Sequence, residues 1–262
     1  MELHRLMTDW NARQYLKFED KRTRAARDLL AQVPLGRVRL AVDLGCGPGN
    51  STALLVASCP DAEVIGVDSS PDMLTQARKR LSKCRFVEAD LSTWTTADRV
   101  DLLFANGVFQ WVPDHLRVLS RLVQALSTGG VLATQIPDIT EIPAVAIMRE
   151  VANSGPWVDN PGVSRAVRGE VPRPESYYDL LKPLCAQLDI WRTTYSHVLP
   201  GPEAVVEWFK GSALQPLLSA LEGESASAFL RAYTAEIERH HSRRVDGCVL
   251  LELPRLFIVA TR

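Results

Sequence analysis

Short apolar runs alternate with amphipathic stretches between Val38 and Ile136, and each amphipathic stretch begins soon after an apolar run ends. This order is typical of a parallel sheet whose strands are joined by helical crossovers. The pattern predicts strands at 38–43, 63–67, 85–88, 101–105 and 130–136. It predicts helices at 51–58, 71–82 and 113–125, where Pro71 and Pro113 suit the first turn of a helix.

The segments around this region are mainly helical in pattern. Apolar residues recur at helical spacing over 9–32, 143–152, about 177–184 and 202–241. Residues 154–174 contain Gly and Pro and are predicted to form a loop, whereas 188–199 and 255–260 are predicted strands. A long helical insertion between late strands would cap the strand ends, where α/β folds bind ligands.

The predicted fold is therefore a doubly wound α/β fold with a mostly parallel, seven-stranded sheet and a helical cap inserted between late strands. A chain of 262 residues suits one large domain. We expect an N-terminal helical cover at 1–34, a cofactor-binding core at 35–140, a cap and substrate region at 141–185 and 200–253, and the last strands at 186–199 and 254–262.

Composition and charge narrow the possible partners. A formal net charge of −1 gives no overall attraction to nucleic acid or anionic lipid. No stretch approaches the roughly 18 apolar residues of a membrane span, and the five widely spaced cysteines suit reduced thiols. We expect a cytoplasmic protein that acts on a small molecule and binds neither nucleic acid nor membranes, and the sequence leaves its oligomeric state open.

A glycine-rich turn at 45–49 follows the first predicted strand and precedes a helix. Gly45, Gly47 and Gly49 would let the backbone turn tightly and approach a ligand closely, because they carry no Cβ. Asp68 ends the next strand, 19 residues after Gly49, close to the offset at which a carboxylate meets ribose hydroxyls. Together these features predict a nucleoside-containing cofactor.

The residues around this turn favour one class of cofactor. The dinucleotide fingerprint needs a glycine three residues after its second glycine, and this turn lacks that spacing. Asp43, just upstream, is unsuited to a phosphate and suited to a cation. S-adenosylmethionine carries an ammonium and a sulfonium and no phosphate, so it fits the turn better. Cys46 lies inside the turn and is more simply a small residue than a nucleophile.

At these motifs the chain resembles class I S-adenosylmethionine-dependent methyltransferases, which have a Rossmann-like fold. The resemblance implies that Asp68 binds the ribose hydroxyls and that Asp90 and Leu91 contact the adenine. Residues 101–111 resemble the fourth-strand motif of that family, which implies that its polar residues face the methionine or the substrate. The cofactor candidates are Trp10, Asp43, Gly45, Cys46, Gly47, Asn50, Asp68, Ser69, Asp90, Leu91 and Asn106.

Segments outside these motifs carry a closer resemblance. Residues 9–11, 110–115, 148–152, 189–195 and 254–260 resemble the bacterial trans-aconitate 2-methyltransferase family, whereas 154–174 resembles it only loosely. The resemblance implies methyl transfer to a carboxylate of trans-aconitate, giving a monomethyl ester and S-adenosylhomocysteine, without a metal. Because a carboxylic acid with a pKa of about 4 is ionised at neutral pH, we expect alignment of the reactants and no catalytic base.

The spectator carboxylates of such a substrate need cationic partners, and Arg binds a carboxylate through two parallel hydrogen bonds. Tyr15 and Tyr195 can donate further hydrogen bonds or belong to the core, and Trp10 can cover the cofactor or hold the N-terminal helix to the sheet. The substrate candidates are Tyr15, Gln110, Trp111, Arg149, Arg192, Tyr195 and Arg255.

Two alternatives stay open at this point. The first is methylation of a phenol, an amine or another acid, for which His115 or His197 would serve as the base. The second is a noncatalytic protein that binds S-adenosylmethionine. We expect both histidines to have surface or capping roles.

Overall fold

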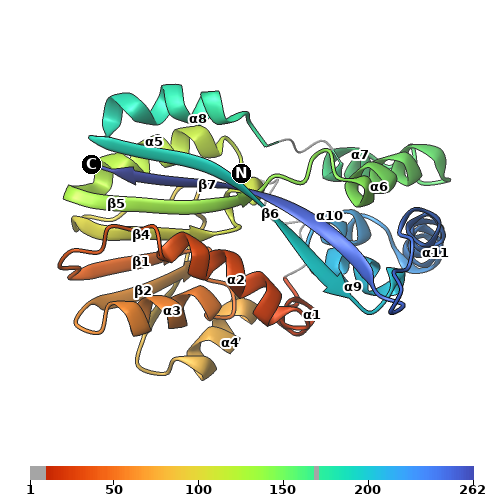
Figure 1. The fold of residues 1–262 in the computed structure, drawn as a ribbon, viewed down its shortest axis with the longest axis horizontal. Helices are drawn as coiled ribbons and strands as arrows, with labels where there is room; N and C mark the ends of the chain where they lie inside the picture. Colours follow the sequence, from red (N-terminus) through yellow and green to blue (C-terminus); the bar gives the residue numbers. More distant parts are fainter. Residues whose placement is uncertain (1–9, 168–170) are drawn as a thin grey trace. The chain divides into compact units, whose positions relative to one another are not determined.

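The computed structural model describes residues 10–167 and 171–262. Its strands form one sheet in the order β3-β2-β1-β4-β5-β7-β6 (Figure 1). They are β1 (Leu40–Leu44), β2 (Glu63–Asp68), β3 (Arg85–Glu88), β4 (Val100–Asn106), β5 (Leu126–Pro137), β6 (Gln187–Leu199) and β7 (Val249–Thr261). β1 to β5 pair in parallel and β7 pairs antiparallel to β5. The predicted mostly parallel, seven-stranded α/β sheet is confirmed.

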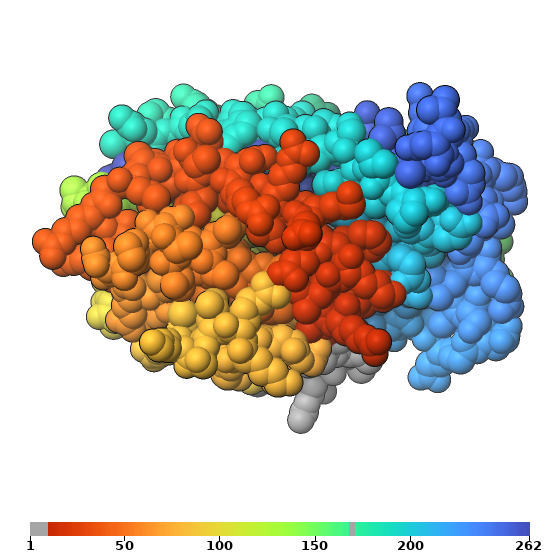
Figure 2. Space-filling model, turned by 60° about the horizontal axis from the view of Figure 1, so that its bottom comes forward, coloured from red at the N-terminus to blue at the C-terminus, as the bar shows by residue number. Residues whose placement is uncertain are grey.

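The chain forms two compact units, and unit 2 holds the sheet core: it comprises Glu19–Pro137, Val171–Thr193 and Arg255–Arg262. Its helices are α2 (Glu19–Leu30), α3 (Asn50–Ser58), α4 (Pro71–Arg80), α5 (His115–Ala125) and α8 (Pro174–Leu181), with short 3-10 turns η1 (Phe109–Trp111) and η2 (Lys182–Leu184). α2 packs on α3, and the two lie side by side on the face shown in Figure 2. α5 packs on α8.

Side chains of the strands alternate between the two faces of the sheet, as strand geometry requires. In β5, Leu132 and Ile136 join the apolar cluster that includes α5 and α8. Gln135 directly precedes Ile136 in the strand, so its side chain points to the opposite face. The side chains of Ala133 and Val131, two and four residues earlier, point to the same face as Gln135. This alternation decides which polar groups reach each face.

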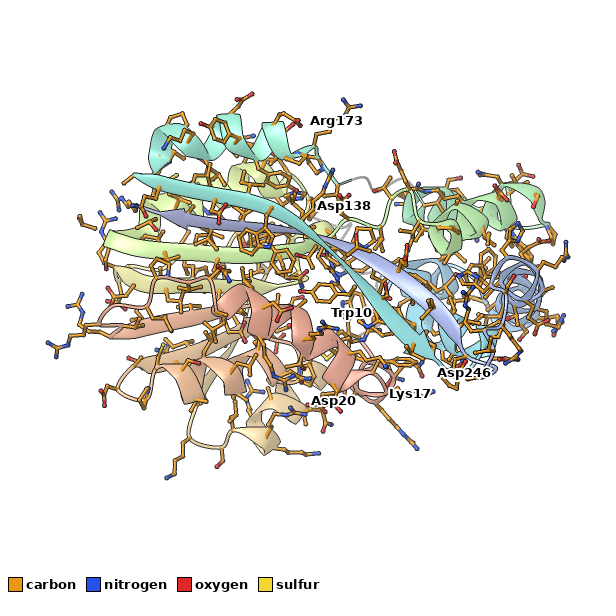
Figure 3. The ribbon with its side chains drawn as sticks, viewed as in Figure 1. Trp10, Lys17, Asp20, Asp138, Arg173 and Asp246 are labelled. Carbon is orange, nitrogen blue, oxygen red and sulfur yellow. The ribbon has the colours of Figure 1, made fainter. Side chains whose placement is uncertain are left out.

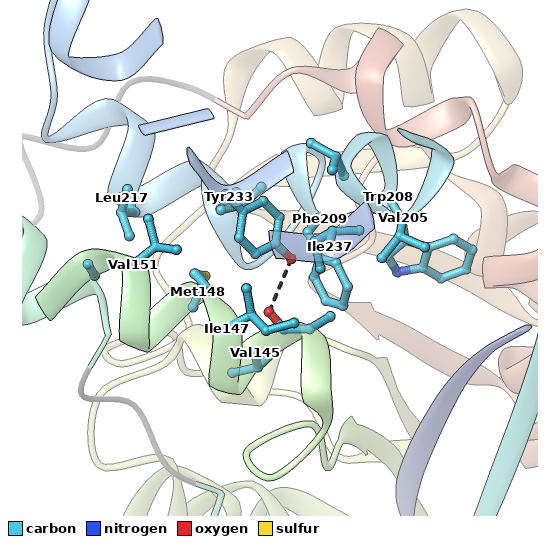
Figure 4. Close-up of a cluster of buried hydrophobic side chains, with 14 of the residues drawn as sticks. Val145, Ile147, Met148, Val151, Val205, Trp208, Phe209, Leu217, Tyr233 and Ile237 are labelled. Atoms are coloured by element: carbon cyan, nitrogen blue, oxygen red, sulfur yellow. Dashed lines mark hydrogen bonds between the residues drawn. The ribbon is translucent and has the colours of Figure 1, made fainter. Parts of the chain in front are cut away.

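Unit 1 comprises the described parts of Met1–Phe18, Asp138–Glu170 and Thr194–Pro254. Its helices are α1 (Ala12–Leu16), α6 (Pro143–Ser154), α7 (Pro161–Ala166), α9 (Pro202–Lys210), α10 (Leu214–Ser219) and α11 (Gly223–His240). α11 packs against α6 and α9 around a buried apolar cluster, and within it the hydroxyl of Tyr233 donates to the carbonyl oxygen of Ala144 at 3.1 Å (Figure 4). Unit 1 thus has a hydrophobic core of its own.

The bounds of the compact units do not coincide with those of the expected segments, and β6 itself is divided, with its residues up to Thr193 in unit 2 and the rest in unit 1. α8 falls within the expected cap segment 141–185 and belongs to unit 2. The expected N-terminal cover is divided, with α1 in unit 1 and α2 in unit 2. The assignment of all 262 residues to a single domain stays a prediction.

The single helix predicted over 9–32 was wrong, because the described part of this segment holds two helices, and Asp9 lies outside the described residues. Trp10 lies two residues before α1, whose start is capped by Asn11, and Lys17 directly follows the helix (Figure 3). Glu207 accepts hydrogen bonds from Gln14 at 3.0 Å and Lys17 at 2.6 Å, so α1 is anchored to α9 inside unit 1. Burial alone would raise the pKa of Glu207, but these bonds and one from Lys210 lower it to about 2.

Two further expectations about elements were wrong. The predicted loop at 154–174 contains α7, whose start is capped by the Asn160 side chain accepting from the backbone of Gly162 at 2.8 Å, with Pro161 in the first turn. Residues 168–170 of that loop lie outside the described residues. Pro113 precedes α5 instead of opening it, because Asp114 adopts a left-handed conformation (φ 50°) and the helix begins at His115. None of the helices in the described ranges is long and apolar enough to cross a membrane.

Candidate functional site

The glycine-rich turn lies between β1 and α3, and all three of its glycines have positive φ angles: 66° at Gly45, 52° at Gly47 and 86° at Gly49. A Cβ at Gly45 would overlap the side chain of Val108, so this glycine lets the turn pack against the segment after β4. A Cβ at Gly47 would meet nothing within 4 Å. The turn is therefore packed at Gly45 and open at Gly47, which is where a ligand can approach the backbone.

Asp68 fixes the turn from the end of β2. Its Oδ2 accepts from the backbone N–H of Gly47 at 2.8 Å, and its Oδ1 accepts from that of Ser70 at 2.9 Å. The carbonyl of Val67 also accepts from the backbone of the turn, at 2.8 Å from Gly45 and 3.0 Å from Cys46. The acid that ends β2 is thus hydrogen-bonded to the glycine turn, and its binding of the ribose hydroxyls stays a prediction.

Asp43 lies beneath the start of α3 and is fully buried. Its Oδ2 accepts from the hydroxyls of Ser51 at 2.8 Å and Thr52 at 2.6 Å. Burial raises the pKa of Asp43, the two hydroxyls oppose the shift and the nearby carboxylate of Asp68 adds to it, and together these effects bring the pKa to about 7. These contacts give Asp43 a part in holding the first turn of α3 against β1, beside the role predicted for it toward the cofactor.

The raised pKa of Asp43 predicts a pH dependence of stability. In the unfolded chain the group titrates near 3.8 and in the folded protein at about 7, so between these values the folded state binds more protons. The free energy of unfolding should therefore fall as pH rises from about 4 to about 7. Asp43→Asn should flatten this fall, because the amide cannot ionise while its oxygen can still accept from Ser51 and Thr52. Urea unfolding of both proteins without cofactor, at several pH values, measures this dependence. If the free energy of unfolding changes with pH equally in the two proteins, Asp43 is not its cause.

The candidates after β3 lie in a loop tied to α5. The Oδ1 of Asp90 accepts from the backbone of Ser92 at 2.8 Å, and Leu91 is buried. Arg121, which the sequence analysis missed, donates to the carbonyl oxygens of Leu91 at 3.0 Å, Ser92 at 3.0 Å and Trp94 at 3.2 Å. Three such bonds from one guanidinium fix the path of the loop that carries the predicted adenine contacts.

The remaining candidates of the turn have distinct surroundings. Asn50 is the first residue of α3, and its amide donates to the hydroxyl of Thr23 in α2 at 3.5 Å. Ser69 is exposed beside Asp68. Burial raises the pKa of the Cys46 thiol well above its usual value, so the thiol stays protonated, as suits a small buried residue.

Three candidates from different strands and loops meet at the end of β4. The Nε2 of Gln135 donates to the Oδ1 of Asn106 at 2.7 Å, and Nη1 of Arg255 donates to the Oε1 of Gln135 at 3.2 Å. Beside them the side-chain amide of Gln110 donates to the carbonyl oxygen of Gly107 at 2.6 Å. The structure thus brings Asn106, Gln110 and Arg255 together and adds Gln135, which the sequence analysis did not single out.

The other acceptor candidates are divided between the units. Trp111 is partly buried in unit 2, and Arg192 lies exposed on β6 in the same unit. Tyr15, Arg149, Tyr195 and the cofactor candidate Trp10 belong to unit 1. Arg149 donates to the carbonyl oxygens of Thr140 at 2.7 Å and Val167 at 3.3 Å, so it also joins two loops of that unit.

The expectation that His115 and His197 have surface or capping roles was wrong, because both are buried. The Nε2 of His115 lies 2.8 Å from the hydroxyl of Tyr177, and burial lowers the pKa of the imidazole. The ring of His197 lies between those of Tyr195 and Trp208, with centroids 6.1 Å and 4.7 Å away. In residues 10–167 and 171–262, no group of three or more His, Cys, Asp or Glu side chains is placed to hold a metal ion.

Comparison with known proteins places the chain in a family. The family described as "Methyltransferase domain" matches residues 41–130, which include the glycine turn and Asp68. A trans-aconitate 2-methyltransferase of Rhodopseudomonas palustris strain HaA2 is 52% identical over 256 residues, covering 98% of this chain and 100% of the relative. One from Agrobacterium fabrum is 49% identical over 253 residues, covering 97% and 99%. The chain belongs to the trans-aconitate 2-methyltransferase family.

Solved structures agree on the fold of this family member. A YcgJ protein from Bacillus subtilis superposes with a TM-score of 0.58 at 11% identity, covering 91% of this chain and 98% of that one. A putative methyltransferase from Bacillus halodurans superposes with a TM-score of 0.55 at 13% identity, covering 90% and 97%. The predicted class I methyltransferase fold, and the family resemblance seen in the sequence, are therefore confirmed.

Proposed function

We propose that this protein transfers a methyl group from S-adenosylmethionine to a carboxylate of trans-aconitate, releasing a monomethyl ester and S-adenosylhomocysteine. The observation that carries the proposal is about half identity, along nearly the whole chain, to proteins named trans-aconitate 2-methyltransferase. The shared length extends through both compact units, so the similarity is not limited to the cofactor motifs.

The residues of unit 2 fit the methyl donor. Gly47 offers open space beside a carboxylate that ends β2, and Asp90 and Leu91 follow the next strand of the sheet. Asp68 would bind the ribose hydroxyls, Asp90 and Leu91 the adenine, and Asn106 the methionine part. When bound, the donor supplies an electrophilic methyl group on a sulfonium, and the protein holds that methyl group in line with the acceptor oxygen.

The acceptor carboxylate needs no proton removal at neutral pH, so the residues of the site have to align it and exclude water. His115 is buried and its Nε2 is already within 2.8 Å of the hydroxyl of Tyr177, which supports a structural role for it. The arginines are the groups that we assign to the spectator carboxylates of trans-aconitate.

Replacing Arg149, Arg192 or Arg255 with Ala is expected to raise KM for trans-aconitate and to change kcat less. Each lost charge-assisted contact corresponds to about 1.5–3 kcal/mol, which is a rise of about tenfold to about 150-fold. Arg149→Ala should also lower the melting temperature, because two backbone carbonyls lose their donor. Arg117→Ala, at an exposed position of α5, is the matched control. If an Ala variant has the same KM for trans-aconitate as the control, the arginine that it replaces does not bind the substrate.

The proposed reaction is tested by incubating the protein with labelled S-adenosylmethionine and trans-aconitate, cis-aconitate, citrate, isocitrate or a simple phenol, and identifying the product by mass. Preferential formation of a trans-aconitate monomethyl ester is the expected result. Labelling of the phenol with a rate that rises through a histidine pKa would point to the base-assisted reaction instead. Donor binding without transfer to any acceptor would point to a noncatalytic protein.

The proposal includes a cytoplasmic location and a small-molecule acceptor. All five cysteines are free, as suits a reducing compartment, and the net charge of −1 disfavours nucleic acid as the acceptor.

A further inference from the structure

Gln135 joins two candidate site residues that are far apart in the sequence. Its side chain is 1% exposed, on the face of β5 opposite α5 and α8. It contacts Asn106, the last residue of β4, at 2.7 Å and Arg255 of β7 at 3.2 Å. Its own backbone carbonyl accepts from the N–H of Gly107 at 2.9 Å. We call Asn106, Gln135 and Arg255 the amide relay.

The polarity of the amide relay is fixed from one end. A guanidinium has only donors, so the atom of Gln135 that faces Arg255 must be its oxygen. The opposite atom is then the amide nitrogen, which donates, and Asn106 must turn its oxygen toward it. The Asn106 nitrogen consequently points away from Gln135 as a donor. Through Gln135, Arg255 thus sets the orientation of the side-chain amide of Asn106.

Three nitrogen-bearing side chains of this region converge over Gly107, whose φ is 71°. A Cβ built there would lie 3.2 Å from the amide nitrogen of Gln135, 3.8 Å from Nη1 of Arg255 and 3.9 Å from the amide nitrogen of Gln110. One of these groups is positive and the other two are neutral donors, and none is a carboxylate. Such a group of donors suits an anionic ligand.

We propose that Gln135 is a positioning residue that adapts this site to an anionic acceptor: its neutral amide holds Arg255 and orients Asn106 without cancelling the positive charge of the guanidinium. This inference rests on the proposed function for the identity of the acceptor. A carboxylate at position 135 would also accept from Arg255, but it would form an ion pair there and repel a substrate carboxylate.

The test compares Gln135→Glu, Gln135→Met and Thr134→Val. Thr134 is the matched control, because it is fully buried next to Gln135 on the opposite face of β5 and its hydroxyl has no hydrogen-bond partner among the described residues. Binding of trans-aconitate is measured by calorimetry with S-adenosylhomocysteine present, together with kcat, KM and the melting temperature. Gln135→Glu should weaken trans-aconitate binding by about 100-fold, the effect of a like charge about 6 Å away at an effective dielectric constant of about 20. Gln135→Met should weaken it by about fivefold, because Arg255 and Asn106 lose the two hydrogen bonds that position them while no negative charge is added, and Thr134→Val should leave it unchanged.

The order of the two Gln135 variants separates the proposal from a purely structural role. A structural role predicts that Gln135→Met, which loses both hydrogen bonds, is the more damaging, and that order would overturn the proposal. If Gln135→Glu does not fold, Gln135→Met decides: about a fivefold rise of KM for trans-aconitate in the folded variant supports the inference, and an unchanged KM overturns it. Absence of methyl transfer by the unsubstituted protein would refute the proposed reaction, whereas the order of dissociation constants still decides the role of Gln135.

Discussion

Replacing Asp68 with Ala is expected to weaken binding of S-adenosylhomocysteine by at least about 100-fold, because two charge-assisted hydrogen bonds to the ribose hydroxyls would be lost. The backbone N–H groups of Gly47 and Ser70 would lose their acceptor in the same step, so the glycine turn would also be held less firmly. Calorimetric titration with S-adenosylhomocysteine measures the effect.

Asp61→Ala is the control for this experiment, since Asp61 is exposed just before β2 and contributes to neither the turn nor the ribose site. A melting temperature recorded for each variant separates loss of binding from loss of fold. If Asp68→Ala binds S-adenosylhomocysteine as tightly as the control does, the assignment of Asp68 to the ribose is wrong.

The second large effect is expected at the glycine turn, where neighbouring glycines should respond differently to Ala. Gly45→Ala forces a Cβ into Val108 at a positive φ angle, and overpacking with backbone strain together cost about 2–5 kcal/mol. A fall in melting temperature of about 4–20 °C is the expected result. Gly47→Ala meets no atom within 4 Å and bears only the strain of about 1–2 kcal/mol, so it should fold and lose donor binding.

Gly36→Ala is the matched control, because its Cβ also meets nothing within 4 Å and its backbone does not need a positive φ angle. Thermal unfolding and S-adenosylhomocysteine titration of the three variants give two readouts for each glycine. Normal donor binding by a folded Gly47→Ala variant would show that the ligand does not approach the open side of the turn.

Local patterns were sufficient to predict the sheet and the cofactor turn. β3 was predicted at the residues where it is found, and the other parallel strands within a few residues of their observed bounds. This was possible because a buried parallel strand has a short run of apolar residues between turn residues. The link from Gly47 to Asp68 was also predictable, since the acid ends the strand that lies beside β1.

The features that were missed depend on partners distant in the sequence. The break between α1 and α2 follows from the contacts of Gln14 and Lys17 with Glu207, 193 and 190 residues later, which helical periodicity cannot show. The burial of His115 depends on Tyr177, which is 62 residues away. α7 is different, because Asn160 followed by Pro161 was a helix-start signal that could have been recognised.

The antiparallel strand β7 has a consequence for how the protein is made. Its residues pair with β5, and the Gln135–Arg255 bond spans 120 residues of sequence. On the ribosome, β1 to β5 and the glycine turn are therefore synthesised well before the strand that completes the amide relay. During that interval β5 presents an open edge, the kind of surface that pairs with other nascent chains. Under the proposed function, the residues assigned to the donor are thus synthesised before Arg255, which is assigned to the acceptor, and donor bound to the growing chain would stabilise the incomplete sheet at the stage when it is most exposed to aggregation.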